Sequence, residues 1–272
     1  MFSWIRFSCV LGLFCALLAL PLHAQSAEQV QVGPPPVHRA EPPAPGATPE
    51  ELENRGDELR TDKDFLDAID FYQAALKGAP GSPGSASLFN KIGMCQLQMH
   101  RDKDAKRSFE RSIKADHNHA DAYNNLGATY YDMHNNNAAI KQYEKAISLK
   151  NDAAGYYSNL GTAYFAKRQF EKAIETYAKA VRLDPDVLDV SSHGGLQARM
   201  ASSEDRAHYD YVLARLYART GESDRSLHYL KMAMEEGYKD IKDVYKDNEF
   251  STLRKDPRFA ELMAAKTLAL PD

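Results

Sequence analysis

Hydrophobic residues recur along the middle of this chain with a long, fixed spacing. The stretch Asn124–Tyr131 (NNLGATYY) reappears as Ser158–Phe165 (SNLGTAYF), 34 residues later. Inside each copy the apolar residues are three or four positions apart, which places them on one face of a helix. A fixed period of this size predicts a stack of similar helical units rather than one globular core.

The two clearest units cover residues 120–153 and 154–187. When each is counted from its first residue, both carry Leu at position 7, Gly at 8, Tyr at 11, Ala at 20, Tyr at 24 and Ala at 27. The first three positions predict one face of a first helix, and the last three predict one face of a second helix. The small residues at positions 8 and 20 predict that the two helices of a unit approach closely.

Three weaker units extend the array over residues 49–82, 86–119 and 207–240. The second of them keeps Ile92, Gly93 and Phe109 at positions 7, 8 and 24, and the last keeps Leu213, Ala214 and Leu230. The first has a charged residue, Arg55, at position 7, and we attribute this to its place at the end of the array, where one face meets water.

These positions resemble the tetratricopeptide repeat family, whose pattern has a large apolar residue at 4, Leu-Gly near 7 and 8, Tyr at 11, Ala at 20, an aromatic residue at 24, Ala at 27 and Pro at 32. The resemblance covers about 170 of the 272 residues. It implies an all-α fold, an α-solenoid of stacked helix-turn-helix repeats. Residues 241–272 would supply the closing helices and tail, with residues 241–265 helical and a last helix beginning after Asp256.

The resemblance also implies a concave face, lined by the first helices, that binds an extended peptide or a partner protein. The residues expected on this face are Asn54, Lys91, Asn124, Asn125, Tyr131, Asn159, Phe165 and Tyr211. Asparagine offers both a donor and an acceptor, so a row of them suits a peptide backbone of any sequence. The alternative, that these amides only satisfy local backbone groups, stays open. The aromatic side chains are expected to add exposed surface for a partner.

One sub-type of the family binds the C-terminal carboxylates of chaperones through Lys and Asn side chains on successive repeats. This chain has Glu53, Asp57 and Asp121 at positions where that sub-type has Lys or Asn. The reversed charges argue against this ligand.

The flanking segments indicate export. Residues 1–24 combine Arg6 with an apolar run and predict a secretory signal peptide, with an uncleaved membrane anchor as the alternative. Residues 25–48 are rich in Pro and Ala and predict an extended, disordered linker. Residues 188–206 interrupt the period and predict an inserted loop, in which His193 and Gly194 are candidates for a binding role or a plain connection.

Composition narrows the function further. The chain has 34 basic and 38 acidic residues, so its mild negative charge argues against non-specific nucleic-acid binding. Removal of the signal would leave one cysteine, Cys95, which we expect to be buried and unreactive. His117 and His119 fall in a turn without further ligands. No catalytic motif, metal site or cofactor site is predicted.

The sequence therefore predicts a non-enzymatic interaction scaffold of the periplasm or the extracellular space. It would bind a protein or an extended peptide in its concave groove, in the assembly of a cell-envelope or secreted complex, and would not span a membrane after signal cleavage. The alternatives are a regulatory or recruiting subunit of an envelope enzyme, and a carbohydrate- or small-ligand-binding protein. The partner and the oligomeric state do not follow from the sequence.

Overall fold

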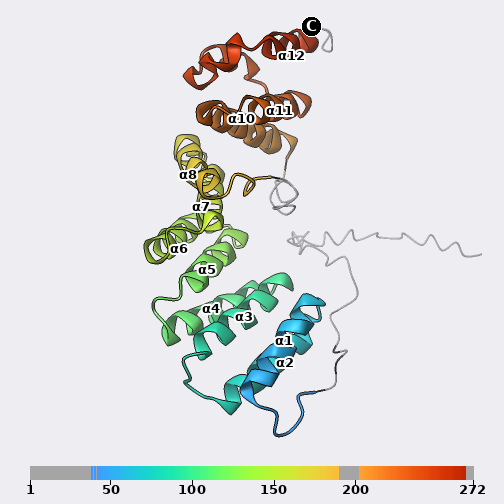
Figure 1. Ribbon diagram of the computed structural model, residues 1–272, viewed down its shortest axis with the longest axis vertical. Helices are drawn as coiled ribbons and strands as arrows, with labels where there is room; N and C mark the ends of the chain where they lie inside the picture. The colour runs from blue at the N-terminus through green and yellow to red at the C-terminus, as the bar shows by residue number, and fades with distance from the viewer. Residues whose placement is uncertain (1–37, 39, 41, 190–201, 268–272) are drawn as a thin grey trace, which may run out of the picture. The chain divides into compact units, whose positions relative to one another are not determined.

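The computed structural model describes residues 38, 40, 42–189 and 202–267. Within these residues every regular element is a helix, and consecutive helices pack as pairs (Figure 1). The pairs are α1 (Pro49–Thr61) with α2 (Phe65–Gly78), α3 (Ser85–Gln98) with α4 (Asp102–Ala115), α5 (Ala120–Asp132) with α6 (Asn136–Leu149), α7 (Ala154–Ala166) with α8 (Phe170–Leu183), and α10 (Ser203–Thr220) with α11 (Ser223–Glu235). The predicted all-α solenoid is confirmed. The predicted signal segment, His193 and Gly194 lie outside the described residues.

Every pair turns at the same repeat position. Position 15 has a positive φ in all five pairs: 65° at Lys63, 56° at His100, 58° at His134, 57° at Arg168 and 85° at Gly221. In each case the N–H of the following residue donates to the carbonyl five residues earlier in the chain, such as Asn135 to Tyr130 at 2.8 Å. This hydrogen bond closes the end of the first helix, so the two histidines of these turns have a structural role.

The close approach of the two helices rests on one recurring contact. In the first four pairs the residue at position 8 is glycine, and a Cβ added to Gly161 would lie 2.5 Å from the ring of Tyr177 at position 24. The same contact joins Gly56 to Tyr72, Gly93 to Phe109 and Gly127 to Tyr143. The fifth pair has Ala214 and Leu230 at these positions, both fully buried. The glycine is therefore needed where position 24 carries an aromatic ring.

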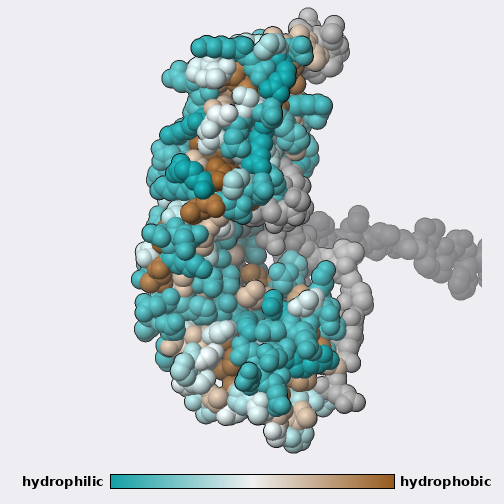
Figure 2. All heavy atoms as spheres, viewed as in Figure 1, coloured by the Kyte–Doolittle hydropathy of each residue, from teal (hydrophilic) through white to brown (hydrophobic). Residues whose placement is uncertain are grey.

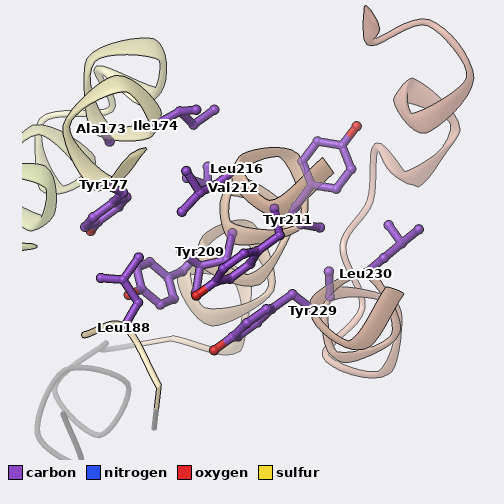
Figure 3. Close-up of a cluster of buried hydrophobic side chains, with 14 of the residues drawn as sticks. Ala173, Ile174, Tyr177, Leu188, Tyr209, Tyr211, Val212, Leu216, Tyr229 and Leu230 are labelled. Atoms are coloured by element: carbon purple, nitrogen blue, oxygen red, sulfur yellow. The ribbon is translucent and has the colours of Figure 1, made fainter. Parts of the chain in front are cut away.

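The largest buried cluster lies where the fourth and fifth pairs meet. Figure 3 shows side chains of α8, α10 and α11 converging there, among them Ile174, Tyr177, Tyr209, Val212, Leu216 and Leu230. Val187 and Leu188, which follow α8, are also buried in this cluster. The core therefore continues across the interruption in the repeat period.

The fifth pair begins earlier than the repeat pattern predicts. Helix α10 starts at Ser203, so residues 203–206 of the predicted inserted loop are helical. The hydroxyl of Ser202 accepts a hydrogen bond from the N–H of Asp205 at 3.1 Å and caps the helix. Such a cap, followed by Glu204 and Asp205 in the first turn, favours helix initiation at this point.

The closing segment occupies the position of a sixth pair. Residues 241–255, which we expected to be helical, form three short 3-10 helices, η1 (Ile241–Tyr245), η2 (Asn248–Ser251) and η3 (Leu253–Lys255). The hydroxyl of Tyr211 donates a hydrogen bond to Asp247, which lies 36 residues later in the chain. This separation is close to the repeat length, as expected for a contact between successive repeats. Helix α12 (Pro257–Thr267) then contacts α11. Asp, Asn, Ser and Thr between residues 247 and 252 favour local side-chain bonds over helix, which explains the broken first element.

The start of the array differs from the expected solvated linker. His38 Nδ1 lies 3.0 Å from Asp67 Oδ1, and the N–H of Ala40 donates to Asp67 Oδ2 at 3.3 Å. Ala40 and Ala47 also pack against a buried cluster of the first two pairs, which includes Leu52, Tyr72 and Leu88. The end of the linker is therefore packed on α2, because a buried aspartate there needs partners.

Position 7 of the first pair holds a charged residue where the repeat pattern has leucine. Arg55 is exposed and donates a hydrogen bond to Glu58 at 2.6 Å, whereas Leu126 and Leu160 at the equivalent position are buried.

Within residues 42–189 and 202–267, no helix combines the length and the hydrophobicity needed to span a bilayer.

Candidate partner-binding site

The predicted site residues lie on the first helices of the pairs. Helix α3 contacts α5, and α5 contacts α7, so side chains at repeat positions 5 and 6 of neighbouring pairs meet. Asn90 on α3, Asn124 and Asn125 on α5, and Asn159 on α7 come together in this way, and we call these four residues the amide row.

The amide row is a continuous chain of hydrogen bonds. Asn159 Nδ2 donates to Asn124 Oδ1 at 2.9 Å, Asn124 Nδ2 donates to Asn125 Oδ1 at 3.3 Å, and Asn125 Nδ2 donates to Asn90 Oδ1 at 3.0 Å. The chain ends where Asn90 Nδ2 approaches Met94 Sδ at 3.7 Å, a weak acceptor. The first helices of three successive pairs, α3, α5 and α7, are therefore connected through their side-chain amides.

The amides keep hydrogen-bonding capacity for a ligand. Each side-chain amide has two N–H donors, and the row uses one donor of each asparagine. Asn124, Asn125 and Asn159 are half-buried, so part of each residue is accessible to a ligand. The alternative that they only satisfy local backbone groups does not describe these bonds, because each links one side chain to another.

The sequence-based prediction omitted Asn90. This residue is 7% exposed, and its main contact is the amide of Asn125. We infer that it orients Asn125 rather than meeting a partner. Its repeat position, 5, is also that of Asn124, so the signal was present in the sequence, although the expected row followed position 6.

Two of the predicted polar residues, Asn54 and Lys91, are not part of the row. Asn54 lies exposed on α1. Lys91, on α3, donates to Glu53 Oε1 at 2.7 Å and to Asp57 Oδ2 at 2.6 Å, and both carboxylates lie on α1. Burial works to lower the pKa of Lys91, but the hydrogen bonds to Asp57 and Glu53 outweigh it and raise the pKa. Lys91 is thus a charge bridge between the first two pairs, and the carboxylates opposite it are already neutralised in part.

The carboxylate of Asp121 is also engaged inside the array. The hydroxyl of Tyr156, on α7, donates to Asp121 Oδ1 on α5. Burial and this hydrogen bond raise the pKa of Tyr156, so the phenol stays neutral. The contact links the same two helices that Asn159 and Asn124 link, and it further fixes the spacing of the amide row.

The aromatic candidates divide into two kinds. Tyr131 and Phe165 are half-buried. Phe165 packs edge-on against Tyr209 with ring centroids 5.3 Å apart, and it lies 5.5 Å from Phe170. Tyr131 and Phe165 therefore keep some surface for a partner, and Phe165 has a firm apolar support.

Tyr211 does not add exposed surface, and that expectation is wrong. Its side chain is 3% exposed, its hydroxyl donates to Asp247 Oδ2 at 2.8 Å, and its ring stacks on Tyr238 at 4.2 Å. The closing segment covers this part of the first-helix face. A repeat pattern alone cannot reveal this, because the covering residues lie outside the recognisable repeats.

The other residues singled out in the sequence are engaged in the fold. Cys95 is fully buried, and burial, above all, raises the pKa of its thiol to about 12. His119 Nδ1 lies 2.9 Å from the Ser112 hydroxyl. Among the described residues, no group of three or more His, Cys, Asp or Glu is placed to hold a metal ion.

Several solved structures of repeat proteins are similar to this chain. The chain is similar to MamA, at 26% identity over 66% of this chain and 93% of that chain, with a TM-score of 0.47. It is similar to YrrB, described as a TPR protein with an unusual peptide-binding site, at 18% identity over 69% and 85%, with a TM-score of 0.46. It is also similar to TTC0263, a TPR protein of Thermus thermophilus, at 18% identity over 79% and 99%, with a TM-score of 0.47.

Part of the sequence also matches models of known protein families. No curated protein matches the chain. Tetratricopeptide repeat models match residues 108–141, 129–167 and 154–187. These segments cover α5, α7 and most of the amide row, and the helix pairs, the turn at position 15 and the contact between positions 8 and 24 continue the same unit on both sides. Residues 108–187 are therefore tetratricopeptide repeats, and the helix pairs on both sides are similar to them.

Proposed function

We propose that this protein is a scaffold that binds an extended peptide segment of a partner protein along its first helices. The coarse part of this function, a protein-interaction scaffold, is general for tetratricopeptide repeats. The finer part rests on one observation, the amide row across α3, α5 and α7.

The amide row suits a peptide backbone for a physical reason. An extended backbone presents N–H and C=O groups along its length, and each asparagine has both a donor and an acceptor. Because the amides are already hydrogen-bonded to each other, their orientation is fixed before a ligand arrives. A pre-oriented site loses less conformational entropy on binding. Tyr131 and Phe165 offer apolar contacts beside the row.

The experiment is affinity capture with the Asn125→Ala, Asn159→Ala double variant. Bait protein would be incubated with an envelope extract, and the captured protein would then be titrated against purified bait. We expect the double variant to bind at least fivefold more weakly than the wild type. The control is Asn118→Ala, since Asn118 is exposed in the turn before α5. An affinity within twofold of the wild type would eliminate the amide row as the binding site.

We also propose that the protein acts outside the cytoplasm, in the assembly of a cell-envelope or secreted complex. The support is the sequence of residues 1–24, with a charged start and an uncharged apolar run. Mass spectrometry of the protein isolated from cell fractions tests this. A mature chain that begins near residue 25 in the envelope or medium is expected. An intact N-terminus in the cytoplasmic fraction would contradict export.

A further inference from the structure

The second helices have a surface feature that peptide binding along the first helices leaves unused. A hollow of about 480 Å³ opens between α8 and the end of α10, and one of about 370 Å³ opens between α6, α7 and α8. Glu175 and Lys179 line both hollows, so the two are adjacent across the exposed side of α8. We call the two hollows together the α8 surface.

The α8 surface has the opposite charge to the chain as a whole. Its lining includes Lys172, Lys179, Arg182 and Arg219 against two acidic residues, whereas the chain has a net charge of −4. Within the described part of the chain, Lys179, Arg182 and Arg219 form no salt bridge with an acidic residue. Other cations of the same two helix pairs, such as Arg215, are bound by carboxylates at 2.8 Å.

One of the two acidic residues, Glu144, already accepts a hydrogen bond within the protein. Glu144 Oε1 accepts a hydrogen bond from the Tyr164 hydroxyl at 2.9 Å. The ammonium of Lys172 lies 5.5 Å from the centre of the same ring, a cation–π contact. Lys179, Arg182 and Arg219, which form no salt bridge with any described residue, line the larger hollow at the α10 end of the surface, where Glu175 is the acidic residue beside them. The charge of Arg219 also helps to lower the pKa of Glu249.

Part of the lining of the smaller hollow is apolar, and we call this part its apolar floor. It consists of Ile147, Tyr157 and Leu160, which line the hollow together with the charged side chains. On the face drawn in Figure 2, small hydrophobic patches lie among hydrophilic residues at the level of α6, α7 and α8. An apolar floor beside a cluster of cations is the complement of a segment that carries both carboxylates and an apolar side chain.

We propose that the α8 surface is a second docking site, which binds an acidic extended segment of a partner protein. Carboxylates of the segment would pair with Lys179, Arg182 and Arg219, and a neighbouring apolar side chain would enter the hollow over Ile147 and Leu160. Charge complementarity selects an acidic partner, and the apolar floor selects a polypeptide over a nucleic acid backbone.

The test uses the full chain and a capped peptide with one leucine between two runs of glutamates. Binding is measured by fluorescence anisotropy, with glutamine and lysine analogues of the peptide as comparisons. We expect binding of the glutamate peptide, at least tenfold weaker binding of both analogues, and weakening as salt is raised. Equal affinity for the glutamine analogue would overturn the proposal, because charge would then play no part.

A second experiment measures the peptide affinity of two double variants, each of which removes two positive charges. Lys179→Gln with Arg219→Gln should weaken binding at least fivefold. Lys114→Gln with Lys141→Gln removes the same charge from exposed positions outside the hollows and should leave affinity within twofold. Similar losses in both double variants would mean that only net charge matters, and would refute a specific site. Circular dichroism verifies that both variants fold.

Two further measurements distinguish the α8 surface from the amide row and from a nucleic-acid site. Asn159→Ala should leave binding of the acidic peptide unchanged, since the amide row lies on the first helices. A loss there would mean that the peptide occupies the amide row, which would overturn the second site while leaving the proposed function intact. A single-stranded oligonucleotide that binds as tightly, through Lys179 and Arg219, would overturn the assignment to a protein partner.

Discussion

The contact between Gly161 and Tyr177 gives the sharpest prediction. An alanine at position 161 would place its Cβ 2.5 Å from Tyr177 Cε1 and 2.6 Å from Cδ1. Non-bonded carbon atoms pack at about 3.5–4.0 Å, so the ring would have to withdraw by about 1 Å. Tyr177 is fully buried, and its hydroxyl lies 3.1 Å from the Thr162 hydroxyl, so the ring has little room to withdraw.

The expected magnitude follows from two opposing effects. Overpacking of a well-packed core costs about 1–3 kcal/mol. Replacing a glycine inside a helix by alanine stabilises the helix by about 0.5–1 kcal/mol. Gly161→Ala should therefore destabilise the protein by about 0.5–2 kcal/mol. Gly155→Ala is the matched control, because Gly155 lies on the same helix and its added Cβ would meet no atom within 4 Å.

The assay is urea unfolding followed by circular dichroism for the wild type and both variants. Midpoints are compared, because a repeat array need not unfold in one step. The midpoint of Gly161→Ala should lie below the wild type, and that of Gly155→Ala at or above it. If Gly161→Ala unfolds at the same urea concentration as Gly155→Ala, the close contact does not determine the helix spacing.

A double variant tests whether the ring is the obstacle. The fifth pair combines Ala214 with Leu230 at the same two positions. Gly161→Ala with Tyr177→Leu should therefore be less destabilised than the sum of the single variants, with a coupling of about 0.5–3 kcal/mol. Strict additivity would mean that the added methyl group is resisted by something other than the Tyr177 ring.

Three further predictions concern other parts of the array. Lys91→Met should lower stability by about 0.5–1 kcal/mol, since it leaves Glu53 and Asp57 facing each other without the cation between them; the unfolding midpoint, measured in low and high salt, would show a smaller deficit in high salt. Cys95 should react with a thiol reagent far more slowly in the native protein than in urea, because it is fully buried with a pKa raised to about 12; equal rates would contradict its burial. Stability should be constant up to about pH 9 and fall above it, because burial raises the pKa of the Cys95 thiol from 9.0 and that of the Tyr238 phenol from 10.0 to about 12 in the folded state, which favours the neutral form of both groups there. Urea midpoints measured between about pH 8 and pH 11.5 test the direction, and Tyr238→Phe should reduce the fall.

Much of the fold was predictable because its determinants are local. Leu, Gly, Tyr and Ala recur at fixed positions, and helical geometry alone places them on one face. The glycine at position 8 was correctly interpreted as a close-approach residue. Its actual neighbour, the ring at position 24 of the same pair, emerged only from the structure, because the pairing of two faces depends on how the helices cross.

The candidate site was only partly predictable. Asn124, Asn125 and Asn159 were expected on the first helices, but no pattern in the sequence indicated that their side chains bond to each other. Asn90 shares repeat position 5 with Asn124, a signal that the expected row at position 6 did not use. The burial of Tyr211 and the packing of the linker on Asp67 were also missed. Each of these two contacts joins residues that are distant in sequence, and one end of the contact lies outside the repeat pattern.

The sequence by itself determined the repeating unit, its helices and its family, since a 34-residue period specifies which residues each unit buries against the next. Only the tertiary structure decided which polar groups remain for a partner. Hydrogen bonds and ion pairs between side chains about 34–36 residues apart engage Lys91, Asp121 and Tyr211 within the array, and they leave part of the capacity of the amide row at the surface. The physical reason is that burial of apolar residues follows a local period, whereas the pairing of polar groups depends on distances set when successive helices pack.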